Sequence, residues 1–357
     1  MLTNLDGAAA DVLEAHQAKY EATDGFRAVV FDGRDVTVVV DDRFLAAWRE
    51  RLAGSDVRAA PSCVGQDVID AASQALRTFN YGPGDFASAG YDALSDAVIV
   101  HATFDTQDVV RALEAAASVR RPSDYVADAR RDETLRLRKN ERGDATRSSR
   151  TSDSSPFRGG ARIHIGNAGC TTGFYIDSNT NGTVMVTAGH CSNGNNGRTV
   201  WNGNDSEQVG TTEGVRFPNP DLVLIDGAAY NARSYAWNDQ TTTKAVTGSA
   251  NPTTGVVYCQ FGATTLRVCY AYDSLSEQFC DESGCTNSLA FTEAPQGPNC
   301  SMGSGGDSGG GVHREVSGGV SARGIVIARG GDAQHCYAWD HKRQTVLNTY
   351  DATVVTQ

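Results

Sequence analysis

A glycine-rich stretch of the chain, Gly305 to Gly310, presents the hydroxyl of Ser308 directly after an acid, Asp307. A serine hydroxyl is a weak nucleophile near neutral pH, so it needs a base that takes its proton and N–H donors that hold the oxyanion. Because glycines adopt positive φ at little steric cost, the N–H groups of Gly306 and Ser308 can turn into one pocket. A lone Gly-Asp-Ser-Gly is more often a surface turn. The stretch therefore predicts a nucleophile only if a base and an acid lie elsewhere in the chain.

His190 is the candidate base. It lies in the segment Thr-Ala-Gly-His-Cys, directly after an apolar run at 184–186 that predicts a strand. A single histidine is commonly structural or a metal ligand. No H-x-x-x-H or C-x-x-C spacing accompanies this one, and we therefore expect neither a metal nor another cofactor.

Asp221 is the candidate acid, and it opens a second apolar run at 222–225. A buried carboxylate at this point would accept a hydrogen bond from the imidazole, fix its tautomer and stabilise the imidazolium. Taken alone, Asp221 would be an ordinary acid at the edge of a strand. The order His190, Asp221, Ser308 along the chain is one of the known orders of a Ser-His-Asp triad, and it predicts acyl-transfer chemistry.

Together, the three motifs resemble those of chymotrypsin-fold serine proteases, and in particular the bacterial branch of alpha-lytic protease and the streptogrisins. Further segments at 170–174, 215–218 and 262–265 are similar to that branch. The resemblance covers residues 157–357. It implies an all-β catalytic domain of two six-stranded antiparallel β-barrels, with His190 and Asp221 on the first and Ser308 on the second. The activity it implies is that of a secreted serine endopeptidase that forms an acyl-enzyme.

The resemblance also implies the residues that contact a protein or peptide substrate. The backbone N–H groups of Gly306 and Ser308 would form the oxyanion hole. Ala328, Arg329 and Gly330 would pair with the substrate as an extra strand, and Met302 and Gly303 would line the specificity pocket. No acid stands where it would favour basic residues, so we expect an apolar preference, with an acidic preference through Arg329 as the alternative.

Two features depart from the bacterial branch. An arginine just after the position of Cys259 usually pairs with the acid that precedes the nucleophile, but this chain has Gln260 there. The partner of Asp307 is therefore open, with Arg267 as a candidate from its place in the sequence. In addition, Cys300 stands farther before Ser308 than in alpha-lytic protease.

Eight of the nine cysteines lie between residues 170 and 336, and only Cys63 lies before them. An even set confined to one region indicates a disulfide framework formed outside the reducing cytosol. Spacing alone leaves the pairing open. The resemblance implies the pairs Cys170–Cys191, Cys259–Cys269, Cys280–Cys285 and Cys300–Cys336.

Composition narrows the partners and the location. The formal net charge of −12 argues against nucleic acid, and no apolar run is long enough for a membrane span. The opening residues show neither a basic n-region nor an apolar h-region of a signal peptide. We nevertheless expect signal-directed secretion, because the cysteines indicate an oxidising compartment.

Residues 1–128 predict a small α+β unit without a cluster of nucleophile, base and acid. Helical patterns at 8–22, 43–53, 66–79 and 106–117 alternate with strand patterns at 26–31, 36–40 and 97–100. The resemblance implies a pro-region that assists folding, inhibits the enzyme and is then removed. The alternative is an independent binding domain fused to a protease.

Residues 129–156 are rich in charged and small polar side chains, which indicates a flexible, cleavable linker. We expect maturation by cleavage between about residues 147 and 158. Two other functions compete with this zymogen hypothesis. One is an inactive protease-fold binding protein, although the whole triad is present. The other is a carboxylesterase, which usually carries its serine in G-x-S-x-G and its histidine last in the chain.

Overall fold

The computed structural model describes residues 7–31, 35–62, 64–82, 85–93, 96–102, 129–131, 149–227, 229–295, 302–331 and 335–357. The chain forms two compact units. Unit 1 comprises Met1–Thr134, Pro252–Val257 and Ala271–Thr292, and unit 2 comprises Leu135–Asn251, Tyr258–Tyr270 and Glu293–Gln357. Within the described part of the chain, none of the helices combines the length and apolarity that a membrane span requires.

The first part of unit 1 is a three-stranded sheet with order β1-β2-β3. Valines of β1 and β2 supply its core, and Trp48 packs against the rings of Tyr20 and Phe26. The helix, hairpin strands and helix that the sequence predicts here are present, whereas the third strand was not predicted. The elements are α1 (Gly7–Tyr20), β1 (Phe26–Phe31), β2 (Val36–Asp41), the 3₁₀ turn η1 (Asp42–Phe44), α2 (Leu45–Arg51) and β3 (Val57–Ser62).

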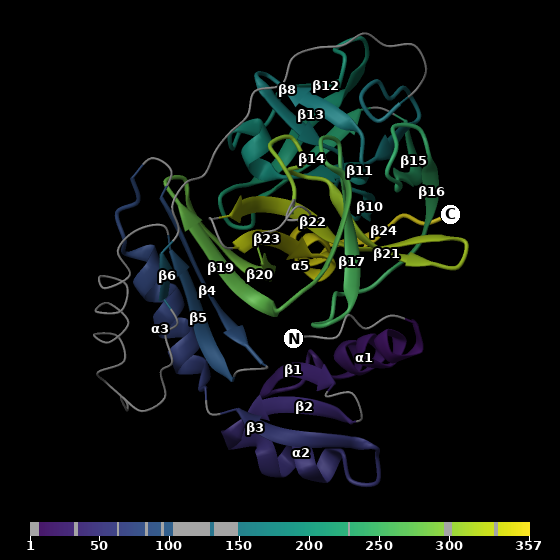
Figure 1. Ribbon diagram of the computed structural model, residues 1–357. Coiled ribbons are helices and arrows are strands. Elements are labelled where there is room, and N and C mark those ends of the chain that lie inside the picture. The colour runs from purple at the N-terminus through teal and green to yellow at the C-terminus, as the bar shows by residue number, and fades with distance from the viewer. Residues whose placement is uncertain are drawn as a thin grey trace. The chain divides into compact units, whose positions relative to one another are not determined.

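The second part of unit 1 is a sheet in which N-terminal strands pair with a hairpin from the second half of the chain (Figure 1). Its order is β20-β19-β4-β5-β6, and β4 pairs antiparallel with β19, with Ala87 opposite Cys280. The predicted helix at 106–117 lies outside the described residues. The elements are α3 (Gln66–Arg77), β4 (Phe86–Asp92), β5 (Ala97–Ala102), β6 (Ala129–Arg131), β19 (Ser274–Asp281) and β20 (Gly284–Pro295).

Unit 2 begins with a sheet that delivers two of the predicted site residues. Its order is β24-β10-β11-β14-β13-β12-β8-β9, and β11 pairs antiparallel with β14 at the centre. The apolar residues of these two strands are fully buried, which explains why both read as continuous apolar runs. The strands are β8 (Arg162–Ile165), β9 (Ala168–Thr171), β10 (Tyr175–Ser178), β11 (Gly182–Thr187), β12 (Thr199–Asn202), β13 (Gln208–Arg216), β14 (Leu222–Gly227) and β24 (Ala352–Val354).

The remaining strands of unit 2 run in the order β18-β17-β21-β22-β23, with β16 joined to β22, and β15 and β7 beyond it. The predicted class, an all-β domain preceded by a small α+β region, is confirmed. The ladders of the described residues are open, however, and do not close into two six-stranded barrels. The elements are β7 (Phe157–Gly159), β15 (Tyr230–Tyr235), β16 (Thr243–Ser249), β17 (Val257–Gly262), β18 (Leu266–Ala271), β21 (Gly311–Val316), β22 (Gly319–Gly331), β23 (His335–Lys342) and α5 (Arg343–Tyr350).

The end of the predicted linker differs from the expectation of a flexible segment. Residues 149–156 are folded into unit 2, where Arg150 and Asp153 are fully buried. Asp153 pairs with Arg158 and accepts a hydrogen bond from the hydroxyl of Tyr235 at 2.8 Å. Composition alone could not show this, because these charged side chains find their partners in residues distant in sequence.

Candidate active site

The local fold of the 3₁₀ turn η3 (Gly189–Ser192), which follows β11, places His190 beside β14. Gly189 allows this close approach. A Cβ atom there would lie 2.9 Å from the backbone N and O of Leu222 and 3.0 Å from Asp221 Oδ1. The sequence Ala-Gly-His thus turns the histidine against the start of the strand that carries the acid.

Asp221 contacts His190 at two points. Its Oδ2 lies 2.6 Å from the ring Nδ1, and its Oδ1 accepts a hydrogen bond of 2.7 Å from the backbone N–H of the histidine. The residue is 4% exposed, so water competes little for the carboxylate. A buried carboxylate on Nδ1 leaves Nε2 facing away from the acid, which is the arrangement that a histidine base requires.

The backbone of Asp221 is fixed by a residue that sequence analysis missed. His341, on β23, accepts a hydrogen bond of 3.0 Å at Nε2 from the N–H of Asp221. Burial lowers the pKa of His341 to about 4 despite the opposing attraction of Asp221, so the ring stays neutral and can accept. No motif surrounds His341 in the sequence, and only folding brings it to this position.

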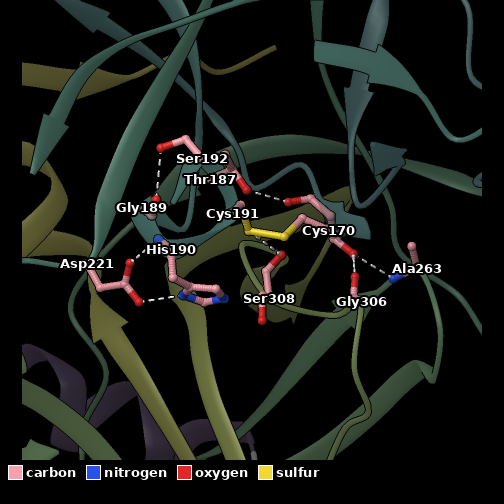
Figure 2. Close-up of a disulfide and its surroundings, with 11 residues drawn as sticks. Cys170, Thr187, Gly189, His190, Cys191, Ser192, Asp221, Ala263, Gly306 and Ser308 are labelled. Atoms are coloured by element: carbon pink, nitrogen blue, oxygen red, sulfur yellow. Dashed lines mark hydrogen bonds and ion pairs between the residues drawn. A yellow bond between two sulfur atoms is a disulfide. The ribbon is translucent and has the colours of Figure 1, made fainter. Parts of the chain in front are cut away.

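A disulfide joins Cys191, next to the candidate base, to Cys170 on β9, with an S–S distance of 2.01 Å. The sulfurs and the His190 ring lie close enough together to suggest a metal site. Because both sulfurs are used in the disulfide, neither offers a thiolate to a metal. Figure 2 shows this bond beside the turn that carries Ser308.

Ser308 lies in a tight turn held between the strands of unit 2. Its carbonyl accepts from the N–H of Thr171 at 2.9 Å, and the N–H of Gly309 donates to Val326 at 2.8 Å. In Figure 2 the ring of His190 has Asp221 on one side and Ser308 on the other. Among the described residues the Ser308 hydroxyl has no hydrogen-bond partner. In proteins without substrate, catalytic hydrogen bonds are often long and tighten only when substrate binds.

Two backbone donors next to Ser308 are available to an oxyanion. Neither the N–H of Gly306 nor that of Ser308 donates a hydrogen bond to a described residue. Gly306 has φ +98°, and its carbonyl is held by the hydroxyl of Thr171 at 2.6 Å. Glycine adopts this positive φ at little steric cost, which explains why a glycine stands here.

Asp307 is fully buried, and its carboxylate is satisfied by the loop after β17 and by its own turn. Oδ1 accepts from the N–H groups of Thr264 and Thr265 at 2.8 and 3.1 Å, and Oδ2 accepts from the N–H of Ser304 at 2.8 Å and from the Thr265 hydroxyl. Arg267, the candidate partner, instead lies 3.1 Å from Glu315.

The predicted substrate residues lie in two segments of unit 2. Met302 is buried, and a Cβ atom on Gly303 would lie 2.9 Å from Cγ of Arg329, so the two segments are in contact. Within the described residues, Ala328, Arg329 and Gly330 pair with β23 alone, since the pairing of β22 with β21 ends at Ile325.

Arg329 is surrounded by acceptors. Its guanidinium forms a 2.6 Å ion pair with the fully buried Asp340 and contacts Gln260 and the Tyr270 hydroxyl. A further nitrogen donates to the carbonyl groups of Ala328 and Trp339 at 2.6 and 3.0 Å. Gln260, which stands in place of the usual arginine, thus binds Arg329 and not Asp307.

Two further disulfides join Cys259 to Cys269 and Cys280 to Cys285, the same pairs that the resemblance implies. Cys336 is also disulfide-bonded, while Cys300, its predicted partner, and Cys63 lie outside the described residues. The hairpin β19–β20 is therefore closed by a covalent bond at its turn.

The sequence of the chain is similar to that of a bacterial serine protease. No family model matches the chain. A curated relative, Serine protease 2 of Streptomyces fradiae, is 31% identical over 113 residues, which are 30% of this chain and 62% of that protein. The match thus spans less than two thirds of the relative.

Solved structures of proteases also match. Thermobifida fusca Protease A is 28% identical, with a TM-score of 0.45, and the match covers 56% of this chain and 98% of that one. Nocardiopsis Protease is 24% identical, with the same TM-score and the same coverage of each chain.

Proposed function

We propose that the chain is a secreted serine endopeptidase that acts through a Ser-His-Asp triad and an acyl-enzyme. The observation that carries this proposal is that two hydrogen bonds join Asp221 to His190, beside Ser308. The turn around Ser308 also has two N–H groups that donate to no described residue. The similarity to serine proteases supports the same chemistry.

In this mechanism Ser308 Oγ attacks the scissile carbonyl, and His190 Nε2 takes its proton. Asp221 holds the imidazole in the required tautomer and stabilises the imidazolium. The N–H groups of Gly306 and Ser308 hold the oxyanion, and His190 then returns the proton to the leaving amine. Water repeats these steps to release the acyl group from Ser308.

Substrate would bind as an extended strand along Ala328, Arg329 and Gly330, whose second edge has no strand partner in the described residues. An apolar preference in the pocket remains our proposal. An acidic preference through Arg329 has less support, because its charge is already balanced by Asp340 and its donors contact protein acceptors.

The N-terminal region is proposed to be a pro-region that holds the enzyme domain through β-sheet pairing. The ladder of β4 with β19 and the apolar core beneath α3 support this, because they join the two halves of the chain in one sheet. Cleavage in the linker would then release the mature enzyme. The disulfides agree with a protein that matures outside the cytosol.

The experiment that tests this proposal is labelling with a fluorophosphonate, combined with cleavage of a peptide library in which the residue before the scissile bond is varied. We expect labelling and cleavage by the wild-type chain and neither by Ser308→Ala. Ser304→Ala is the matched control, because this exposed serine of the same turn contacts Asp307 through its backbone N–H and carbonyl and not through its side chain. A folded, matured wild-type chain that neither cleaves nor labels would favour the inactive binding protein.

A further inference from the structure

Arg150 is a buried cation near the start of the described residues of unit 2. It is fully buried, although it lies in the segment that reads as a linker in the sequence. The backbone around it is fixed, since its N–H donates to Gln240 at 2.7 Å and its carbonyl accepts from Arg162 at 2.6 Å. A buried arginine is expensive to desolvate, so its position needs a reason.

The guanidinium of Arg150 binds three backbone carbonyl groups. Nη1 contacts the oxygen of Gly262 at 2.6 Å, and Nη2 contacts the oxygens of Tyr235 and Trp237 at 3.0 Å each. The side chain thereby ties the ends of β15 and β17 to the N-terminal segment. No carboxylate forms an ion pair with it among the described residues.

The strongest charge interaction of Arg150 is with Asp307, in the turn that carries Ser308. Burial lowers the pKa of Arg150 to about 10, and the attraction of Asp307 is the strongest of the charge interactions that oppose this, ahead of those of Asp239 and Tyr235. Within the part of the chain that the structure describes, the Asp307 carboxylate accepts hydrogen bonds from neutral donors alone. Arg150 therefore adds a charge attraction toward this buried acid, without a direct ion pair between the two side chains.

Gly262 forms the physical link between the two. A Cβ atom at Gly262 would lie 2.1 Å from Asp307 Oδ1, so this glycine packs directly on the carboxylate while its carbonyl is held by Arg150. The next residues of the same loop, Thr264 and Thr265, donate to Asp307. Moving the loop would move Asp307 and, with it, the N–H groups on either side.

We propose that Arg150 is a positioning residue for the oxyanion turn, acting through the Gly262 carbonyl and the buried charge of Asp307. This inference rests on the proposed peptidase function. In the bacterial branch, an arginine at the position of Gln260 usually pairs with the acid before the nucleophile. The proposal gives that role to Arg150, at the N-terminal end of the domain. It also places the maturation cleavage before Arg150, since a cut beyond it would remove the charge from the domain.

For the test, each protein is expressed as the full chain and allowed to mature. The variants are Arg150→Gln, Arg150→Lys and Arg158→Gln. Arg158 is the matched control, because it pairs with the buried Asp153 in the same N-terminal segment and has no link to Asp307 among its charge partners. The values of kcat and KM are measured well below the melting temperature of each variant. The N-terminus of the active enzyme is sequenced in parallel.

For Arg150→Gln we expect kcat to fall by about 10²-fold with a much smaller change in KM, as for a displaced catalytic group. Arg150→Lys should recover part of kcat, because it keeps the charge but loses the fork of donors. Arg158→Gln should lower stability and leave kcat unchanged. The active enzyme should begin at or before Arg150.

Wild-type kcat in folded Arg150→Gln, or an active enzyme that begins after Arg150, would overturn the inference. If Arg150→Gln does not fold, Arg150→Lys with wild-type kcat and KM would overturn it equally. These outcomes all require an active wild-type enzyme, so they differ from failure of the peptidase proposal, in which the wild-type chain itself is inactive.

Discussion

The carboxylate of Asp221 holds both the ring and the backbone of His190, at 2.6 Å from Nδ1 and 2.7 Å from the amide nitrogen. The second contact ties the orientation of the ring to the turn that carries it. Since the N–H of Asp221 in turn donates to His341, the histidine, the acid and β23 form one connected chain of hydrogen bonds.

The substitution Asp221→Asn should therefore lower kcat by about 10⁴-fold while the protein stays folded, because an amide can stabilise the wrong imidazole tautomer. Steady-state hydrolysis of a peptide substrate measures this change. The control is Asp226→Asn, which alters an exposed acid near the end of the same strand. Equal activity of the two variants would mean that Asp221 has no part in catalysis.

Gly306→Ala should lower kcat by about 10²- to 10³-fold, the cost typical of losing one oxyanion donor. Gly306 has φ +98°, and a Cβ atom there would lie 2.6 Å from the Thr264 hydroxyl, so the turn must shift. Gly318→Ala is the matched control, with φ +83° and no atom within 4 Å of the added methyl group. Backbone strain alone would affect both variants, whereas a lost donor affects kcat only in Gly306→Ala.

Glu277 is a buried acid at the pairing of β19 with β4. It is 1% exposed, and a Cβ atom on Gly90 of β4 would lie 1.7 Å from its Oε2. Burial raises the pKa of Glu277 to about 8, helped by Asp92 and Asp273 and opposed by Ser88. The carboxyl group is therefore neutral between the strands below that pH.

Separating β4 from β19 exposes this group to water, where it ionises near its ordinary value of 4.5. The separated state thus binds fewer protons between pH 4.5 and about 8, so the affinity of the N-terminal fragment should fall as pH rises through this range and stay level above it. The fraction of fragment retained by the cleaved complex in size-exclusion chromatography measures this. Glu277→Gln should flatten the profile, while exposed Glu282→Gln should not.

Loss of the Cys170–Cys191 disulfide should affect both stability and kcat. Replacing both residues by alanine should cost about 2 to 5 kcal/mol of unfolding free energy, as is typical of secreted domains. Because Cys191 directly follows His190, kcat should also fall. The pair Cys259–Cys269 is the comparison, and its removal should lower the melting temperature with less effect on kcat.

Local sequence was enough to predict which residues lie together at the candidate site, but not the residues that support them. His190, Asp221 and Ser308 stand in short motifs whose glycines and apolar runs carry the information. His341 and Arg150 have no such motif, because their roles depend on contacts with residues far away in the chain. Strand β4 was missed for a different reason, since the four residues at the centre of Phe86–Asp92 are small and have little β-propensity of their own.

The ladder between β4 and β19 has a consequence for the rest of the chain if the N-terminal region is removed, as proposed above. While the ladder exists, β19 is an interior strand with a neighbour on each side. Removal of the N-terminal region would make β19 an edge strand. Its backbone amides and carbonyls around Gln278 to Asp281 would then face solvent, and such an edge can pair with other extended chains. Such an exposed hairpin could pair with another copy of the chain. Selection against aggregation should therefore act more strongly on β19 than on the interior strands.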